Sequence, residues 1–160
     1  FDTIGFDSIT VSPYMGADSI VPFIQNKSKG VFVLCLTSNP SSSDVQLIND
    51  SRYTVFERIS LLANKLNIND NVGLVVGATK TDYMKKIRMH SDLPWLIPGI
   101  GAQGGNLEES VTISNVKESI GLINVSRGIL FAGDCNIKIV RQSALEYNKK
   151  INQFIKYEKN

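Results

Sequence analysis

The 160-residue chain contains Trp95-Leu96-Ile97-Pro98-Gly99-Ile100-Gly101-Ala102-Gln103-Gly104-Gly105, an apolar run that leads directly into a glycine-rich turn. The apolar run predicts a short buried strand. Gly99, Gly101 and Gly104 follow it with the spacing G-x-G-x-x-G, and glycines at such a turn let the backbone come close to a ligand. The stretch therefore predicts a binding site directly after a strand, and the kind of site depends on the fold around it.

Four further apolar runs predict strands on either side of this one. The five predicted strands are residues 8–11, 31–36, 72–76, 95–97 and 121–125. Each run is continuous rather than alternating, which is typical of parallel strands covered on both faces. Gly, Pro, Ser and Asn gather just after each run. A site is therefore expected at the carboxyl ends of the strands, where open α/β sheets and barrels both bind ligands.

Helices are predicted between the strands, so that a strand and a helix alternate five times in an α/β chain. Thr54 and Glu57 have capping-box spacing, and an apolar stripe follows them at Val55, Ile59, Leu62 and Leu66. Other helices are expected to start near Asp18, to contain Tyr83, to start after Asn106 and to run from about Ile137 to Phe154. Asp134 is expected to cap the last helix.

Composition and charge exclude several classes of protein. The chain is 42% hydrophobic and 20% charged, which is typical of one globular domain of this length. A net charge of +2 gives no electrostatic basis for binding nucleic acid or an anionic membrane, and no apolar run is long enough to span a bilayer. Cys35 and Cys135 have neither metal-ligand nor disulfide spacing, so free thiols and a cytoplasmic location are expected. His90 is expected to face solvent, and no nucleophilic triad is recognisable.

Two architectures fit this pattern. An eight-unit barrel uses roughly 31 residues per βα unit, so residues 1–160 correspond to five units. The chain is then a single domain made of strands 4 to 8 of a (β/α)8 barrel, whose first three units are missing before Phe1. The alternative is a doubly wound, Rossmann-like oxidoreductase domain that binds NADP. Such a fold usually has an acidic residue about 20 positions after the glycines, but Arg127 stands in that region and could bind an NADP phosphate.

The barrel interpretation makes better use of the same residues. Barrel phosphate sites are commonly built from the loops after strands seven and eight. Here those loops are 99–105 and Ser126-Arg127-Gly128, in which Arg127 offers a planar bidentate donor. The stretch Thr37-Ser38-Asn39-Pro40 supplies hydroxyl and amide groups suited to the edge of a base, although on its own it is also a good turn sequence.

Four motifs, taken in order and spacing, give the chain a family resemblance. They are Thr37-Ser38-Asn39-Pro40, Val75-Val76-Gly77-Ala78-Thr79, Pro98-Gly99-Ile100-Gly101-Ala102-Gln103-Gly104-Gly105 and Asn124-Val125-Ser126-Arg127-Gly128. With them the chain resembles orotidine 5'-phosphate decarboxylase, and Thr10-Val11-Ser12-Pro13-Tyr14-Met15-Gly16 is similar to its bacterial and protozoan branch. The resemblance implies a homodimeric (β/α)8 barrel that converts orotidine 5'-phosphate to UMP in pyrimidine biosynthesis without cofactor or metal.

The resemblance also implies roles for individual residues. Ser38 would bind the polar edge of the pyrimidine, Pro98 would line the pocket, and Gln103 would bridge base and phosphate from a closing loop. Arg127 would bind the phosphate with help from backbone N–H groups near Ser126 and Gly128. Leu34 and Val76 would form the apolar wall beside the reacting carboxylate.

The sequence departs from the family where the chemistry is expected. The family places a lysine at the end of strand two and an Asp-x-Lys-x-x-Asp array at the end of strand three, and neither precedes Thr10 in this chain. No catalytic residue is therefore assigned within residues 1–160. A non-catalytic nucleotide-binding protein remains an alternative.

Overall fold

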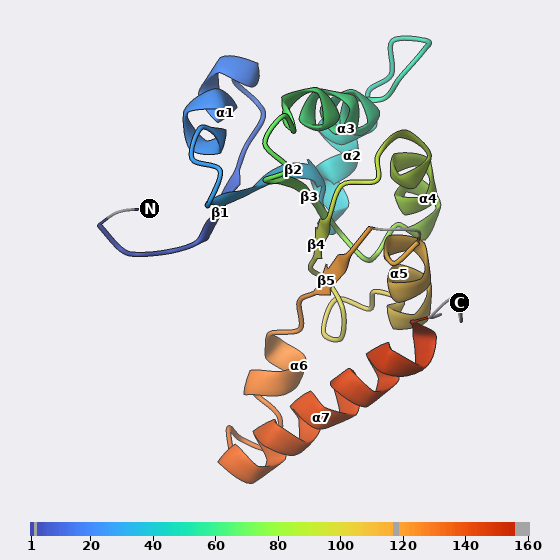
Figure 1. The fold of residues 1–160 in the computed structure, drawn as a ribbon. Coiled ribbons are helices and arrows are strands. Elements are labelled where there is room, and N and C mark those ends of the chain that lie inside the picture. Colours follow the sequence, from blue (N-terminus) through green and yellow to red (C-terminus); the bar gives the residue numbers. More distant parts are fainter. Residues whose placement is uncertain (2, 117–118, 156–160) are drawn as a thin grey trace, which may run out of the picture.

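The computed structural model describes residues 1, 3–116 and 119–155, and its centre is a five-stranded parallel sheet (Figure 1). The strands are β1 (Ser8–Val11), β2 (Gly30–Leu36), β3 (Val72–Val76), β4 (Trp95–Ile97) and β5 (Gly121–Ile123). The helices are α1 (Ala17–Ile24), α2 (Ser43–Gln46), α3 (Val55–Leu66), α4 (Thr81–His90), α5 (Leu107–Ser114), α6 (Arg127–Leu130) and α7 (Ile137–Phe154). The five predicted strands are confirmed, with β5 ending two residues earlier than expected. The short helices α2 and α6 stand where the sequence predicted only loops.

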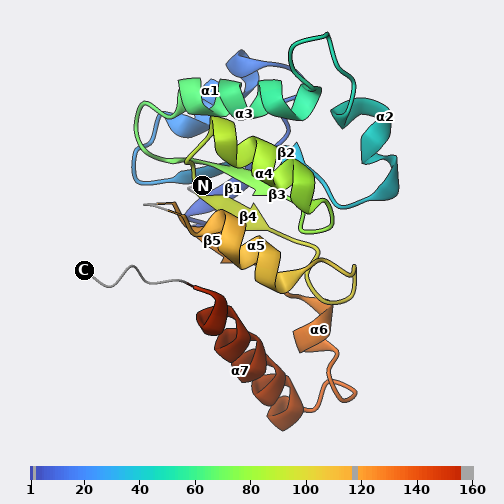
Figure 2. The same cartoon turned by 90° about the vertical axis from the view of Figure 1, so that its right-hand side faces the viewer.

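The sheet order decides between the two predicted architectures. The strands lie side by side in the order β1-β2-β3-β4-β5, and every neighbouring pair is parallel. Helices α1, α3, α4 and α5 all lie along one face of the sheet (Figures 1 and 2). A doubly wound sheet reverses its strand order and carries helices on both faces, so the Rossmann-like NADP-binding alternative is wrong. Consecutive parallel strands with helices outside are five units of a (β/α) barrel, as predicted.

The strand register separates the two faces of the sheet. Leu74 pairs with Val33 and Trp95, which are buried under the helices. On the opposite face, one row of apolar side chains crosses four strands through the pairs Leu34–Val75, Val75–Leu96 and Leu96–Leu122. No described helix lies along this second face (Figure 1).

The two edge strands differ from the expectation of strands buried on both faces. Ser8, Ile9 and Thr10 of β1 are exposed, and Leu122 of β5 is 46% exposed. The expectation is wrong for β1 and β5, because they are edge strands and no described helix covers the second face, and β2 likewise alternates between buried and half-buried residues. It holds for β3, whose five residues are all buried in the middle of the sheet.

Helix α3 begins as predicted but buries a different face. The Thr54 side chain accepts a hydrogen bond from the Glu57 N–H, and the Glu57 carboxylate accepts one from the Thr54 N–H at 2.8 Å, so the capping box is confirmed. The fully buried residues of the helix are Phe56, Ser60 and Ala63, whereas the four residues of the predicted stripe are only half-buried. Small side chains at two of the buried positions let the helix lie close to the sheet.

The α6–α7 pair extends away from the sheet and packs on α5 (Figure 1). Asn136 caps α7 by accepting a hydrogen bond from the Lys138 N–H at 3.0 Å. The predicted cap, Asp134, instead has φ +55° in the turn before the helix, so that prediction is wrong.

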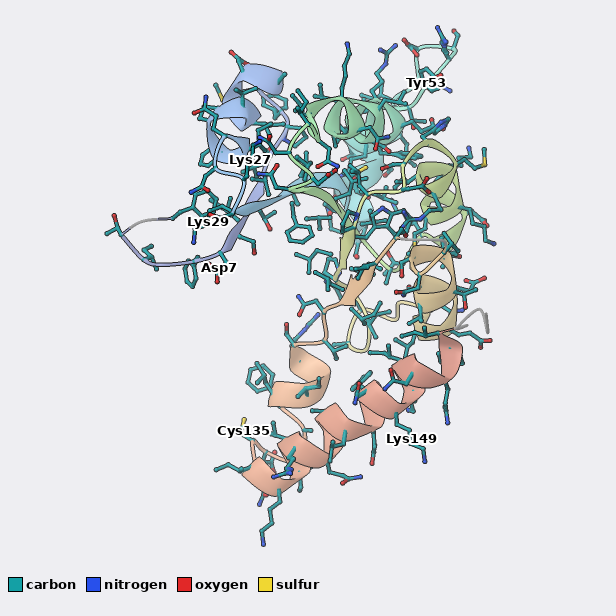
Figure 3. The ribbon with its side chains drawn as sticks, in the orientation of Figure 1. Asp7, Lys27, Lys29, Tyr53, Cys135 and Lys149 are labelled. Carbon is teal, nitrogen blue, oxygen red and sulfur yellow. The ribbon has the colours of Figure 1, made fainter. Side chains whose placement is uncertain are left out.

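Cys135 is exposed in the same turn (Figure 3), and Cys35 is buried in β2, so both thiols are free as expected. In the described part of the chain, no helix is both long and apolar enough to cross a membrane.

Candidate functional site

The loops that follow the strands meet at one edge of the sheet because all the strands are parallel. Backbone hydrogen bonds connect them. The Gly77 N–H donates to the Leu36 carbonyl at 2.7 Å, and the Ala78 N–H donates to the Pro98 carbonyl at 2.9 Å. The loops after β2, β3 and β4 are therefore held together at the end of the sheet where the sequence predicted a site.

A cavity of about 170 Å³ lies between the loops after β4 and β5. Its lining residues are Pro98, Gly99, Ile100, Ala102, Gln103, Asn124, Ser126 and Arg127. Four residues assigned to the site from the sequence are thus brought together, although they come from segments about 25 positions apart. Asn124 also lines the cavity, and the motif Asn124–Gly128 contains it immediately after β5 but predicts no role for it.

The glycine-rich loop folds back on itself beside this cavity. Gly99, Gly101 and Gly104 have φ of +101°, +80° and +77°, a region that residues with a side chain rarely adopt. The Gly105 N–H donates to the Gly99 carbonyl at 3.0 Å and closes the loop. Alanine at Gly99 would place its Cβ 2.6 Å from the Ser38 Oγ and 3.0 Å from the Gln103 Oε1. Glycine at this position therefore lets the Ser38 and Gln103 side chains approach each other.

Ser38 lies at the end of β2 with an unused hydroxyl. Its Oγ is buried and has no hydrogen-bond partner among the described residues. The neighbouring backbone is held in place, because the Thr79 hydroxyl donates to the Ser38 carbonyl at 3.4 Å. A hydroxyl that is buried without a partner can both donate to and accept from a ligand that reaches it.

Arg127 is the first residue of α6, and its side chain is exposed. Its guanidinium forms no hydrogen bond or ion pair with the residues that the structure describes. Ser126 precedes the helix and is also exposed, with its hydroxyl 3.4 Å from the Asn124 Oδ1. A free guanidinium at the cavity provides planar donors that match a phosphate or carboxylate.

Gly128 faces α7 rather than the cavity. Its carbonyl accepts a hydrogen bond from the Ser143 hydroxyl at 2.9 Å, and a Cβ at this position would lie 2.9 Å from the Tyr147 hydroxyl oxygen. Gly128 is not one of the cavity-lining residues. In this structure its contacts hold the start of α6 against α7.

Leu34 and Val76, the two residues of the predicted apolar wall, come from adjacent strands. Leu34 is half-buried in β2 and pairs with Val75, whereas Val76 is fully buried and pairs with Leu36 across a register shift. Because side chains alternate along a strand, Val75 is the β3 residue that shares the face of Leu34. An all-apolar strand has no alternation of polar and apolar residues, so its sequence does not distinguish the face of Val75 from that of Val76.

A second cavity, of about 810 Å³, lies at the opposite end of the sheet. It is lined by segments that lead into β3 and β4, including Asn67, Asp70 and Pro94. His90 also lines it and is half-buried, with its Nε2 3.6 Å from the Glu57 Oε1 and its ring edge-on to Tyr53. The expectation that His90 faces solvent is wrong because the end of α4 packs against α3, where the Asn64 side chain donates to the His90 carbonyl at 2.6 Å.

The smaller cavity has no acid or base in its lining. None of its lining residues is Asp, Glu, His or Lys. Cys35 lies in β2 with its thiol 3.3 Å from the Phe56 carbonyl oxygen, and burial raises the pKa of that thiol far above its ordinary value. The described residues contain no group of three or more His, Cys, Asp or Glu side chains arranged to hold a metal ion. The arrangement can bind an anion and a polar ring edge, and it offers no proton-transfer group.

Comparison with known proteins agrees with this geometry. The model of the orotidine 5'-phosphate decarboxylase / HUMPS family matches residues 2–138. The chain belongs to this family. The decarboxylase of Haloarcula marismortui is 44% identical to it over 92% of this chain, and that of Janthinobacterium is 41% identical over 97%.

Solved structures of the family have the same fold. The orotidine monophosphate decarboxylase of Leishmania donovani superposes with a TM-score of 0.87 at 39% identity over 96% of this chain. A putative decarboxylase from Toxoplasma gondii gives a TM-score of 0.89 at 32% identity, also over 96%. The chain spans 58% and 59% of the Haloarcula and Janthinobacterium proteins, and 59% and 60% of the two solved chains.

Proposed function

We propose that this chain supplies the pyrimidine- and phosphate-binding part of an enzyme that decarboxylates orotidine 5'-phosphate to UMP in pyrimidine biosynthesis. The observation that carries the proposal is the cavity beside the glycine-rich loop, where the free guanidinium of Arg127 stands with Pro98 and Gln103. Membership of the family supports the reaction, and the cavity supports a binding place for its substrate.

Arg127 is the phosphate ligand in this proposal. Its unpaired guanidinium at the cavity can form two parallel hydrogen bonds to phosphate oxygens. Backbone N–H groups near Ser126 and Gly128 add donors at the start of α6. Gln103, on the loop after β4, bridges phosphate and base as the loop closes.

Ser38 binds the polar edge of the pyrimidine ring. Its buried hydroxyl lacks a partner among the described residues and lies beside Gly99, which lines the cavity. Pro98 packs against the ring, while Leu34 provides apolar surface near the reacting carboxylate, together with Val75 on the same sheet face in place of the predicted Val76. An apolar wall disfavours the charged carboxylate relative to neutral CO2, while the negative charge moves to ring carbon C6.

The reaction breaks the bond between ring carbon C6 and the carboxylate. CO2 leaves, the electron pair remains on C6, and a proton then adds there to give UMP. The chain's own residues orient the ring and use phosphate binding to close the loop. The lysine and Asp-x-Lys-x-x-Asp array of the family would stabilise the charge and provide the proton, and the proposal requires no cofactor or metal.

The proposal extends to the whole protein. Residues 1–160 form one domain, the last five βα units of the barrel, in a homodimer in the cytoplasm. A barrel of about 250 residues would need three more units. The coding sequence upstream of Phe1 is then expected to contain a strand-end lysine and the Asp-x-Lys-x-x-Asp array. If the lysine and the array are absent and the complete gene product releases no CO2 from orotidine 5'-phosphate, the protein is a non-catalytic nucleotide binder.

Arg127→Ala tests the phosphate role in the complete gene product. We expect UMP binding, measured by calorimetry, to weaken by roughly 10- to 100-fold, because hydrogen bonds to charged groups contribute about 1.5–3 kcal/mol. Uridine, which has no phosphate, should bind equally well to both proteins. Arg127→Lys should recover only part of the loss.

Arg141→Ala is the matched control, because Arg141 is exposed on α7 and outside the cavity lining. It should leave both affinities unchanged. Equal losses for UMP and uridine in Arg127→Ala, or no loss for UMP, would contradict the phosphate role.

A further inference from the structure

Gln46 holds the residue immediately before Ser38 at two points. The Thr37 N–H donates to the Gln46 Oε1 at 2.9 Å, and the Gln46 Nε2 donates to the Thr37 Oγ1 at 2.8 Å. Gln46 is the last residue of α2, and its side chain is half-buried. One amide thus uses its acceptor and its donor on the same residue, which fixes the amide orientation as well as its position.

The hydrogen-bond chain continues past Ser38. The Thr37 hydroxyl accepts from Gln46 and in turn donates to the Asn39 Oδ1 at 2.6 Å. The residues on both sides of Ser38 are therefore tied to Gln46 through one directional chain of donors and acceptors. A carboxylate in place of the amide could accept from both the Thr37 N–H and the Thr37 hydroxyl, but it could not donate to that hydroxyl. The single hydroxyl proton would then be drawn away from the Asn39 Oδ1, and the bond between Thr37 and Asn39 would be lost.

Gln46 also takes over the hydrogen bonding of the backbone where the β2–β3 ladder ends, directly after Leu36. The β2–β3 register shifts between Leu34 and Leu36, and the Leu36 carbonyl still accepts from the Gly77 N–H at 2.7 Å. The next N–H, that of Thr37, is bound by the Gln46 side chain instead of by a strand. The backbone can then turn so that Ser38 lies against Gly77 and Gly99.

We propose that Gln46 is a positioning residue that holds the Ser38 hydroxyl at the cavity and thereby sets the affinity for the pyrimidine base. Gln46 is not among the cavity-lining residues, so it acts through Thr37 and Ser38 rather than by touching the ligand. The inference rests on the proposed function, because it assumes that Ser38 contacts the base.

Gln46→Glu tests this role with little change in size. In the complete gene product, we expect UMP binding to weaken by about tenfold, the loss of roughly one hydrogen bond. Ribose 5-phosphate has no base, so its affinity should not change. Gln142→Glu is the control, because the Gln142 amide also makes a side-chain hydrogen bond, but on the exposed surface of α7.

A double-mutant cycle with Ser38→Ala separates positioning from general destabilisation. If Gln46 acts through the Ser38 hydroxyl, Gln46→Glu should cause no further loss of UMP affinity once that hydroxyl is removed. Additive losses from the two substitutions, or an equal loss for ribose 5-phosphate, would overturn the inference.

Amide hydrogen exchange in the unmodified protein gives a test that needs no variant. The Thr37 N–H lies outside the strand ladder, so protection from exchange comparable to that of β2 amides requires the hydrogen bond to Gln46. Rapid exchange of this amide would overturn the inference.

Failure of the proposed function can be distinguished from failure of this inference. In that case Arg127→Ala leaves UMP affinity unchanged, whereas failure of this inference alone leaves the Arg127 effect intact.

Discussion

Arg88 joins three segments of the chain through one guanidinium. It donates to two carbonyls of the α4–β4 connection, those of Ser91 at 3.0 Å and Leu93 at 3.2 Å, and to the carbonyls of Ile113 at 3.3 Å and Ser114 at 3.1 Å. The last two belong to the end of α5, where helix carbonyls lack partners within the helix. The guanidinium carbon also lies 3.8 Å from the centre of the buried Trp95 ring. Burial lowers the pKa of Arg88 to about 10, so the side chain stays charged at neutral pH.

Arg88→Met is expected to destabilise the fold by about 2–4 kcal/mol, because it keeps much of the apolar contact but leaves several partly buried carbonyls without a donor. Arg88→Lys should also destabilise, since one ammonium cannot reach carbonyls in so many directions. Urea unfolding of the chain measures both effects. Arg141→Met, at an exposed position, should change stability by less than about 0.5 kcal/mol, and a similarly small effect of Arg88→Met would contradict this role.

Some features of single residues can be predicted from their place along a strand. Arg127 follows the last strand, and that position predicts its place at the carboxyl edge, where it lines the cavity. The partners of Arg88 and His90 could not be predicted, because they lie on other elements. Their contacts depend on how α4 packs against α3 and α5.

Helix α3 shows which features of an element are local. Its start depends on Thr54 and Glu57, which are three residues apart, and the capping box is present as predicted. Its buried face depends on the distance between helix and sheet, and the buried positions Ser60 and Ala63 do not stand out in an apolar pattern. Asp134 is a similar case, since Asn136 is equally suited to cap a helix and stands directly before α7.

The capping box gives the stability of the fold a defined dependence on pH. Burial tends to raise the pKa of the Glu57 carboxyl, but hydrogen bonds from Thr54 and the charges of Lys86 and His90 lower it, and the net pKa lies below its ordinary value. The stabilisation is therefore fully present above the ordinary glutamate pKa of about 4.3 and is lost as pH falls through the lowered pKa.

Glu57→Gln is expected to flatten this dependence, because Gln keeps the capping geometry but cannot titrate. Urea unfolding between pH 2.5 and pH 7, chosen to include about two units below that ordinary pKa, should show a smaller acid-induced loss of unfolding free energy than in the unmodified chain. Glu108→Gln, on the exposed first turn of α5, is the control and should follow the unmodified chain. Parallel curves for all three proteins would rule out a stabilising carboxylate at Glu57.

The whole molecule has an uneven distribution of burial. The middle strand β3 is buried along its full length, whereas α7 has no buried residue in 18 and makes its main helix contacts with α5 and α6. The face of the sheet that carries the row from Leu34 to Leu122 is not covered by any helix in the described part of the chain (Figure 1). Local stability is thus expected to fall from the centre of the sheet toward its edges and toward α7.

Amide hydrogen exchange measures this gradient. Amides of β2 and β3 should exchange slowest in the chain, and those of α6 and α7 should exchange faster than those of α3, after correction for intrinsic rates. The physical reason is that opening α7 exposes little buried apolar surface. Protection of α7 equal to that of β3 would contradict the gradient.

The sequence by itself determined the alternation of strands and helices, the carboxyl-edge position of the site and the family. Each depends on local patterns, namely apolar runs, caps and glycine-rich turns, that do not require knowledge of the partner strand. Tertiary structure alone decided that α1, α3, α4 and α5 share one face, that Val75 rather than Val76 lies beside Leu34, and that Gln46 binds Thr37. These depend on strand order, register and side-chain contacts between elements. An apolar run of five residues is compatible with several registers, and only packing in three dimensions selects one.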